Sequence, residues 1–435
     1  MEVWALAGLV RHGLVTGVMK GVPNFSSVTV DPVTQWPRAR AKLRYASAAS
    51  TIATGDADRD PPVALPDDLS RRVYCILGIP IDAIEMSEVL GRIQLAARNA
   101  APFVISTPNV NFLINSRKDA EFREAVLESD LCPTDGMPLV WIARLLGTTI
   151  KQRVAGSDIL DALKSRARSD QPLKVFLFGS TESVAAAAAR ALNVDPSVLT
   201  CIGWICPGFG TIEELSTDRL LEKINSSNAN FLVAALGAKN GQLWLQRNHE
   251  RLRIPIRAHL GAVINFQAGE VKRAPPVLRQ LGLEWLWRIK EEPYLWRRYF
   301  SDGLVLLHLL ITRSLPLAIE AQFLRQRNKR KGHDLVIDTT DHGDCVTLSL
   351  IGFAVGSHAE KAASYFRNAI AGKKQVVIDL SSTRAVDARF FGLLLMLRKQ
   401  LKAHGSTLKF AGMSGKIDRL FRLHGLEYLI PQRKA

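Results

Sequence analysis

The chain has 435 residues, too many for one ordinary domain, so we expect two or three. Hydrophobic residues make up 47% and charged residues 23%, close to an average soluble protein, which argues against a wholly disordered or polytopic membrane chain. The net charge of +16 favours a polyanionic partner, and the candidates are nucleic acid, an anionic membrane surface and phosphorylated substrates. The five cysteines are scattered and form no CxxC pair, which suggests a reducing compartment and no structural zinc.

Residues 1–70 are predicted to be an N-terminal tail and linker. The first twenty are mildly apolar but are interrupted by charged residues, so they lack the apolar core of a signal peptide and indicate a cytoplasmic tail. Residues 30–70 are rich in Ala, Ser, Thr, Asp and Pro without a sustained period, which is linker composition. A DxD pattern, Asp56-Ala57-Asp58, falls in this linker and not at the end of an apolar strand, so we expect no metal there.

Residues 71–270 are predicted to form an α/β domain with a parallel sheet. Short apolar runs such as VYCILGIPI and PFVISTPN alternate with helical stretches such as MSEVLGRIQLAARNA. In two units, LKVFLFGS with TESVAAAAARAL and NFLVAALGA with NGQLWLQRNHERL, Gly179 and Gly237 stand between strand and helix. Free N–H groups at such a helix start commonly bind a phosphate or nucleotide, although a plain crossover has the same pattern.

Residues 271–330 are predicted to be a basic, aromatic helical appendage and linker. Trp, Leu and Arg are interleaved, and Pro293 and Pro316 are expected to interrupt the helical pattern. The apolar run GLVLLHLLIT is shorter than the ~20 residues that a spanning helix needs. The pattern fits a helix on a membrane surface, with Trp and Tyr at the interface and Arg reaching phosphates, and equally fits helices buried against the core.

Residues 331–435 are predicted to be a second, smaller β/α domain. Strand-like runs VTLSLIG, QVVIDLSS and TLKFAG alternate with helical stretches after the basic linker RQRNKRKG.

Asp135, in the otherwise apolar stretch LCPTDGMPLVW, is the candidate for proton transfer. Only His12 precedes His249, so the α/β region up to residue 248 offers no imidazole, and it has no HExxH or paired Cys/His spacing for a metal. Apolar surroundings raise a carboxyl pKa, which makes Asp135 a better base toward a sugar hydroxyl. The alternative is that Asp135 caps the next helix at an Asp-Gly turn. Thr107 and Asn109 add small polar groups at the predicted sheet edge.

Several segments together resemble the WecG/TagA/CpsF family of bacterial glycosyltransferases over about residues 72–300. They are STPNVNFL, CPTDGMPLVW, RVAGSD, KVFLFGS, ALGA and VKRAP followed by LGLEWLWRIKEEPYLWRRY. The resemblance implies a Rossmann-like domain that transfers N-acetylmannosamine or its uronic acid, with inversion, from a UDP-sugar to an undecaprenyl-diphosphate-linked sugar. It implies no metal or other cofactor, and a cytoplasmic protein associated peripherally with the inner face of the plasma membrane.

The resemblance also implies roles for individual residues. Asp135 corresponds to the catalytic base, and Thr107 and Asn109 match polar residues of the same pocket. The segment from Lys272 to Tyr299 resembles an appendage that meets the membrane and closes over the active site. The expected substrate- and UDP-binding residues are Arg153, Gly179, Gly237, Gln242, Arg288, Arg297 and Arg298, the last three as diphosphate contacts because arginine pairs well with phosphate.

Two departures from the family pattern concern the same pocket. Where the family usually reads G-A-P-K-Q-E this chain has GAKNGQ, so Gly241 stands at the Gln position unless the register slips to Gln242. Where the family reads F-D-F this chain has INF, with Asn265. Altered sugar specificity is the first explanation and loss of activity is the second.

The C-terminal unit resembles a STAS domain through VVIDLSS, AVDARFFGLLLML and TLKFAGMS. In the anti-sigma-factor antagonists of that family, the segment after the second strand carries Asp-Ser-Ser-Gly with a phosphorylatable serine. The corresponding residues here are Asp387, Ala388, Arg389 and Phe390, which offer no hydroxyl. We therefore expect no phosphoserine switch, and a domain that docks a protein partner or senses a ligand.

The first hypothesis is therefore a glycosyltransferase of surface polysaccharide synthesis. The second is a non-catalytic, membrane-associated regulator that senses a nucleotide-sugar and acts through its STAS domain. A nucleic-acid binder is third, because the sequence has no recognisable nucleic-acid motif and its basic residues cluster with Trp and Leu. A STAS-bearing anion transporter is excluded by the missing spans.

Overall fold

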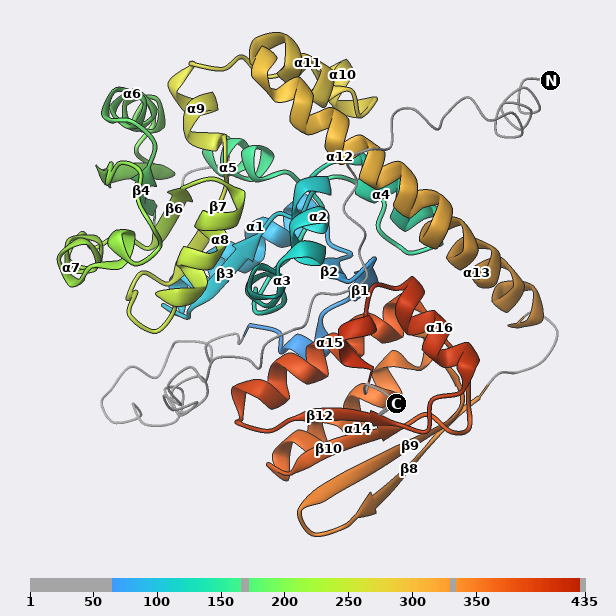
Figure 1. Ribbon diagram of the computed structural model, residues 1–435. Coiled ribbons are helices and arrows are strands. Elements are labelled where there is room, and N and C mark those ends of the chain that lie inside the picture. The colour runs from blue at the N-terminus through green and yellow to red at the C-terminus, as the bar shows by residue number, and fades with distance from the viewer. Residues whose placement is uncertain (1–64, 166–171, 329–333, 431–435) are drawn as a thin grey trace, which may run out of the picture. The chain divides into compact units, whose positions relative to one another are not determined.

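The computed structural model describes residues 65–165, 172–328 and 334–430 (Figure 1). Most of the predicted tail and linker, including Asp56-Ala57-Asp58, lies outside the described residues. The described residues begin with a short 3-10 helix, Asp68–Ser70, followed by an antiparallel hairpin of β1 (Val73–Ile76) and β2 (Ile79–Asp82).

A five-stranded parallel sheet forms the centre of the predicted α/β region, which confirms that fold class. Its strands are β3 (Phe103–Ser106), β4 (Leu173–Gly179), β5 (Leu199–Ile205), β6 (Phe231–Ala235) and β7 (Ile256–His259), in the order β3-β7-β6-β4-β5. From β4 the chain moves outward to β5 and then returns to β6 on the other side of β4. The strand order therefore reverses between β4 and β6, the place where ligands of open α/β sheets bind.

Helices cover both faces of this sheet, which is why its strands are apolar on both sides. One face packs against α1 (Met86–Arg98), α5 (Gly156–Lys164), α6 (Glu182–Leu192) and α9 (Val263–Ala268). The opposite face packs against α7 (Asp218–Asn225) and α8 (Ala238–Arg247), and Figure 1 shows α6 and α7 on opposite sides of β4. Between β3 and α5 the chain forms α2 (Val110–Lys118), α3 (Ala120–Leu127) and α4 (Met137–Leu145).

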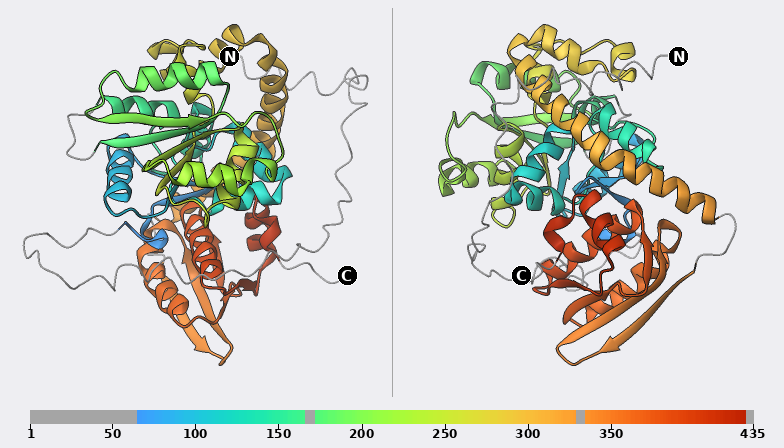
Figure 2. Two further views of the ribbon diagram at one scale, coloured as in Figure 1. Left: turned by 90° about the vertical axis from the view of Figure 1, so that its left-hand side faces the viewer. Right: turned by 45° about the vertical axis from the view of Figure 1, so that its right-hand side comes forward.

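The appendage consists of α10 (Pro276–Gln280), α11 (Glu284–Glu291) and one long helix, Pro293–Phe323, seen as a continuous rod in Figure 2. The long helix contains α12 (Trp296–Leu309), a π-helical turn Leu310–Ser314 and most of α13 (Leu315–Asn328). The expectation that Pro316 interrupts the helix is wrong. The N–H of Leu315 donates to the carbonyl of Leu310, five residues back, so a π-helical turn accommodates the proline ring.

By length and composition the Pro293–Phe323 helix is long and apolar enough to cross a membrane, which the short run GLVLLHLLIT did not suggest. One side of it is nevertheless packed on protein: Leu309, Ser314, Leu317 and Ala318 are buried.

The C-terminal unit has a second sheet, as predicted. Its strands are β8 (Leu335–Asp341), β9 (Cys345–Ala354), β10 (Gln375–Asp379), β11 (Thr383–Val386) and β12 (Leu408–Ala411). The parallel order is β11-β9-β10-β12, and β8 pairs antiparallel with β9 in the long hairpin visible in Figure 2. The sheet is accompanied by the α-helices α14 (Ala359–Ala371), α15 (Ala388–Ala403) and α16 (Gly415–Leu423).

The apolar core of the C-terminal unit extends into the α/β region. It includes Val73 and Ile79 of the β1–β2 hairpin and Leu139 and Ile142 of α4, together with residues of α14, α15 and α16. The described residues all belong to one compact unit of the chain, Thr54–Ala435.

Candidate active site

Asp135 is held beside the carboxyl end of β3 by backbone hydrogen bonds. The segment Ser129–Asp135 first runs next to β3, where the N–H of Ser106 donates to the carbonyl of Leu131 at 2.9 Å. It then turns, and the N–H of Asp135 donates to the carbonyl of Pro108 at 2.8 Å. Asp135 therefore lies against the loop that carries Thr107 and Asn109.

Asp135 is not the cap of α4. The N-cap residue is Gly136, which has φ 113° and no side chain to cap the helix, and Pro138 occupies the first turn. A positive φ of this size favours glycine, so the Asp-Gly pair sets the direction of the chain here. The carboxylate one residue earlier is left without a capping role.

The pKa of the half-buried Asp135 carboxyl is raised to about 7, mainly because the group is desolvated, and the nearby carboxylates of Glu284 and Asp158 act in the same direction. The Arg153 and Arg273 guanidinium groups oppose this shift. A carboxyl group that titrates near neutral pH has the proton affinity that a general base needs.

Thr107 and Asn109 border the same loop. Thr107 is buried, and its hydroxyl oxygen lies 3.5 Å from the position that a Cβ on Gly156 would take. Asn109 caps α2 by accepting a hydrogen bond from the N–H of Phe112 at 3.2 Å, which leaves its amide nitrogen available for other contacts. Its Cβ lies 3.8 Å from the position that a Cβ on Gly136 would take.

Arg153 belongs to a cluster of arginines around Asp158. Arg153 pairs with Asp158 at 2.7 Å and with Glu284 of α11, so the appendage is tied to the α/β region beside Asp135. Arg273 and Arg279 pair with the same Asp158 carboxylate, at 2.5 Å and 3.3 Å. The sequence reasoning did not single out these last two arginines, although VKRAP, which contains Arg273, was part of the resemblance.

The three arginines predicted to contact a diphosphate lie in two different environments. Arg288 pairs with Glu292, and its guanidinium carbon lies 5.2 Å from the centre of the Phe266 ring, next to the Asn265 position. Arg297 and Arg298 are exposed on α12, near the rings of Trp296 and Tyr299. The structure thus brings Arg288 toward the residues after β7 and leaves the other two on the surface of the appendage.

Gly179 and Gly237 lie at the carboxyl ends of β4 and β6, on the two sides of the strand-order reversal. Gly179 has φ 109°, and a Cβ there would overlap the carbonyl of Ala235. Gly237 has φ 80° and is the N-cap of α8, with no atom within 4 Å of the position that a Cβ would take. An open helix N-terminus at a strand-order reversal suits a phosphate group.

Gln242 is buried in the packing of α8 against α3. Its amide nitrogen donates to the carbonyl of Ala125 at 3.0 Å and to the hydroxyl of Ser129 at 3.2 Å. The neighbouring Gly241 has the ring of His259 directly against it, so that a Cβ at residue 241 would overlap the imidazole.

His259 was missed by the sequence reasoning, which counted histidines only up to residue 248, whereas β7 extends the same sheet to residue 259. Burial lowers the pKa of His259 to about 4, so the ring is neutral near pH 7. Neither ring nitrogen has a hydrogen-bond partner among the described residues. Its position at the end of a strand was the signal that could have identified it.

Within the described ranges, no group of three or more His, Cys, Asp or Glu side chains is arranged to hold a metal ion. The prediction of metal independence is therefore left to experiment.

Two family models match the chain. The one described as "Glycosyl transferase WecG/TagA/CpsF family" matches residues 74–319, and the one described as "Mlab, STAS domain" matches residues 337–431.

Two curated relatives carry the name N-acetylglucosaminyldiphosphoundecaprenol N-acetyl-beta-D-mannosaminyltransferase. The protein of Bacillus spizizenii is 25% identical over 206 residues, 47% of this chain and 77% of the relative. The protein of Bacillus subtilis (strain 168) is 24% identical over 198 residues, 46% of this chain and 75% of the relative. Among solved structures, the murine Solute Carrier 26 family member A9 anion transporter aligns with 88% of this chain and 69% of its own at 10% identity. Its TM-score of 0.17 is too low to support an argument about the fold.

Proposed function

The chain belongs to the WecG/TagA/CpsF family of glycosyl transferases, and from that premise we propose that it moves an N-acetylhexosamine-type sugar, ManNAc or ManNAcA-like, from a UDP-sugar to a polyprenyl-diphosphate-linked acceptor. The names of the two Bacillus relatives describe a mannosaminyl transfer onto a diphosphoundecaprenol-linked N-acetylglucosamine. The observation that carries the proposal is Asp135, a carboxylate with a pKa raised to about 7 that its own helix does not use as a cap.

In the proposed reaction Asp135 takes the proton of the acceptor hydroxyl. The acceptor oxygen then forms a bond to the anomeric carbon as the bond from that carbon to the UDP oxygen breaks, which inverts the configuration. Negative charge grows on the departing diphosphate, and stabilising this charge is the main electrostatic requirement of the step. Thr107 and the free amide of Asn109 supply hydrogen-bonding groups next to the base, where they can orient the acceptor hydroxyl.

A UDP site is supported at the strand-order reversal between β4 and β6. The carboxyl ends of these strands carry Gly179 and Gly237, and Gly237 is the N-cap of α8. The cluster of Arg153, Arg273 and Arg279 supplies positive charge near Asp135. Asp158 partly neutralises these arginines and holds them in place, so their side chains are already oriented before a ligand binds.

The departure at Gly241 does not leave a hole in the protein. The ring of His259 takes the space into which a side chain at residue 241 would extend, so an imidazole faces that space where the family has an amide. We propose that this exchange, with Asn265, changes the donor sugar that is accepted and does not abolish transfer.

The long helix of the appendage supports attachment to the inner membrane face as a peripheral protein. Its exposed apolar residues recur every three or four positions and so form one stripe. They are Trp296, Phe300, Leu304, Leu307, Ile311, Leu315, Ile319 and Phe323. The opposite side is packed on protein at Leu309 and Leu317, so a helix lying in the membrane surface keeps these contacts, whereas a spanning helix would lose them.

The transfer proposal is tested by incubating the full chain with a panel of UDP-sugars and a short-chain polyprenyl-diphosphate-linked N-acetylglucosamine, with the product identified by mass. We expect one donor to add an N-acetylhexosamine or its uronic acid and to release an equal amount of UDP, with or without EDTA. Binding of a UDP-sugar without transfer to any acceptor would instead support the nucleotide-sugar-sensing regulator.

The membrane proposal is tested by co-sedimentation with vesicles that contain anionic lipid. Leu307→Glu and Ile311→Glu place charge in the apolar stripe and should reduce vesicle binding. Ser301→Glu adds the same charge at an exposed position of the same helix outside the stripe, and should leave most binding intact. Equal losses in all three variants would show that net charge, and not the stripe, governs attachment.

A further inference from the structure

Helix α15 of the STAS domain uses one face to contact the glycosyltransferase part of the chain. Residues three or four apart lie on one side of a helix, and such a series contacts the β1–β2 hairpin and the loop after α3. Arg389 donates to the carbonyl of Val73 at 3.0 Å, and Gly392 allows an approach so close that a Cβ would overlap the same carbonyl. Met396 and Lys399 continue this face.

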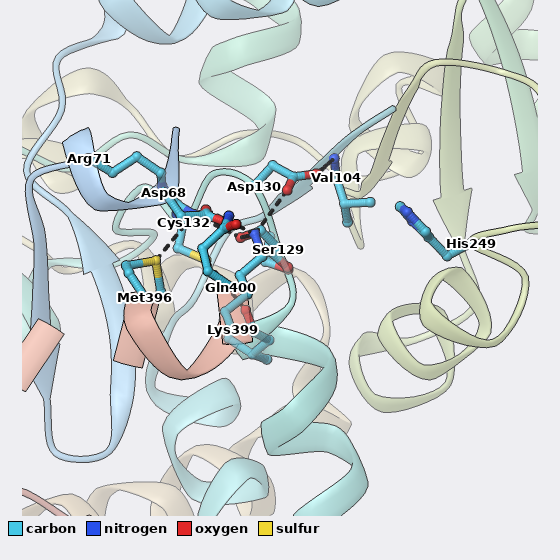
Figure 3. Close-up of polar contacts among 12 residues, drawn as sticks. Asp68, Arg71, Val104, Ser129, Asp130, Cys132, His249, Met396, Lys399 and Gln400 are labelled. Atoms are coloured by element: carbon cyan, nitrogen blue, oxygen red, sulfur yellow. Dashed lines mark hydrogen bonds and ion pairs between the residues drawn. The ribbon is translucent and has the colours of Figure 1, made fainter. Parts of the chain in front are cut away.

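Lys399 is buried and reaches the segment that leads to Asp135. Its ammonium donates to the carbonyl of Ser129 at 3.1 Å, to the carboxylate of Asp130 at 2.9 Å and to that of Asp68 at 3.0 Å. Figure 3 shows Lys399 and Gln400 beside Asp68, Ser129 and Asp130. Burial alone would lower the pKa of Lys399, but the carboxylates of Asp130 and Asp68 outweigh it and raise the pKa, so Lys399 is charged.

The contacts of Lys399 belong to a larger ionic network on the glycosyltransferase side. Arg71 donates to the same Ser129 carbonyl at 3.1 Å and forms a two-pronged pair with Asp82 at 3.1 Å and 2.7 Å. Asp82 in turn accepts from the N–H of Cys132 at 2.6 Å. Three buried or partly buried carboxylates thus face two cations, and Lys399 is the cation that the STAS domain supplies.

This network and β3 hold the segment Ser129–Asp135 from two sides. Near its start the segment is tied to β3, because the N–H of Asp130 donates to the carbonyl of Val104 at 2.8 Å and the Asp130 carboxylate accepts from the N–H of Val104 at 2.9 Å. Lys399 binds the start of the segment, at Ser129 and Asp130, and Asp135 lies at its end. Small displacements of a catalytic group reduce turnover strongly, since the reacting atoms must stay aligned.

We propose that Lys399 is a positioning residue of the active site, so that the STAS domain is a fixed part of the catalytic unit and its α15 face is occupied by the glycosyltransferase part of the same chain. This inference rests on the proposed function for Asp135. It goes beyond that function because it assigns the STAS domain an intramolecular task. Of the residues that correspond to the phosphorylatable segment of antagonists, Arg389 takes part in this contact by binding the hairpin, and Asp387 caps α15 within the STAS domain.

The test compares three variants of the full chain. Lys399→Met removes the ammonium but keeps the length of the side chain, and Lys399→Arg restores the charge. Lys402→Met is the matched control. Lys402 lies about one helical turn after Lys399 on α15. It pairs with Glu124 and Glu128 of the same interface, outside the segment Ser129–Asp135. Turnover is measured by UDP release, and amide hydrogen exchange is measured on peptides from residues 129–135 and from β6.

We expect Lys399→Met to lower kcat about tenfold or more while KM for the UDP-sugar changes less than about threefold, because the base is displaced and the donor site is not. Exchange should rise in residues 129–135 and stay unchanged in β6. Lys399→Arg should recover most of the loss, and Lys402→Met should resemble the unmodified protein.

The proposal is overturned if Lys399→Met keeps its kcat and its exchange pattern, or if Lys402→Met loses as much, or if exchange rises equally in β6. Should Lys399→Met not fold, Lys399→Gln removes the charge but keeps a hydrogen-bond donor at the same position, and it is judged by the same criteria. If the unmodified protein transfers no sugar, the proposed function fails by itself, and the exchange pattern still decides whether Lys399 positions the segment.

Discussion

Two aspartates stand just before a helix in the two α/β parts of the chain, Asp135 before α4 and Asp387 before α15. Asp387 is the N-cap of its helix: it accepts from the N–H of Phe390 and from the N–H of Gly356, each at 2.8 Å. Asp135 is followed by Gly136, which takes the N-cap position in its place. Burial raises the pKa of both carboxyl groups, but only Asp387 has both carboxylate oxygens occupied by backbone donors.

The difference shows that burial of an acid before a helix is not sufficient to make it a base. The oxygens of a capping carboxylate already accept the hydrogen bonds that stabilise its helix, so they are not available to take a proton. One residue of displacement, caused by a glycine with positive φ, separates the carboxylate from the helix and leaves it available for proton transfer.

The first prediction tests whether Asp135, unlike Asp387, is needed for transfer. Asp135→Asn keeps the shape of the side chain but cannot accept the acceptor proton, so we expect turnover to fall by about 10²–10⁴, the usual contribution of a general base. UDP-sugar binding, measured by calorimetry, should change little. Near-normal transfer by this variant would remove Asp135 from the mechanism.

The pH dependence of transfer tests whether the Asp135 carboxylate is the base. Because the pKa of Asp135 is about 7, the fraction of active carboxylate should fall about tenfold for each pH unit below that value and level off above it. Measuring kcat/KM across the range from about pH 5.5 to 8.5 checks this. A profile that is flat through neutral pH would mean that another group takes the proton.

Stability should respond to the same carboxyl group in the opposite sense. The folded protein holds the Asp135 proton up to about pH 7, whereas the unfolded chain releases it near 3.8, so the group makes folding less favourable as pH rises between these values. Asp135→Asn should therefore raise the free energy of unfolding by about 1–3 kcal/mol above pH 7, with partial solvent screening taken into account, and by almost nothing near pH 4. Thermal unfolding at the two pH values measures it, and an equal effect at both would contradict the shift.

Asp387 should give the smallest effect, and it should be an effect on stability. Asp387→Ala removes the cap of α15 and is expected to lower the free energy of unfolding by about 1–2 kcal/mol. Asp387→Asn retains a capping oxygen and should cost less. Transfer per folded molecule should stay close to that of the unmodified protein in both variants, and a large loss would show that the two aspartates are functionally alike.

Much of the fold could be predicted from the sequence, because strand-length apolar runs and helical periods are local patterns. The parallel α/β region, the helical appendage and the STAS-like unit all follow from such patterns and from the family resemblance. The continuous helix through Pro316 could not be predicted, since the π-helical turn that accepts the proline depends on the packing of the helix against its neighbours.

The candidate site was only partly predictable. Asp135, Thr107 and Asn109 stand out in the sequence, and the structure brings them to one edge of the sheet. Arg279 and His259 did not stand out, because their roles depend on the residues that they contact. Arg279 pairs with Asp158, more than a hundred positions away, and His259 of β7 lies against Gly241 of α8. Gln242 shows the reverse: the sequence suggested it as a binding residue, and its side-chain amide donates to the carbonyl of Ala125 in the packing of α8 against α3.

The sequence by itself determined the fold class, the family and the identity of the carboxylate, since these depend on residue types and spacings along the chain. Only the tertiary structure decided that Asp135 does not cap its helix, and that a lysine 264 positions later holds the segment on which it sits. The physical reason is that both outcomes depend on backbone angles and buried charge pairs, which form only when distant parts of the chain have packed together.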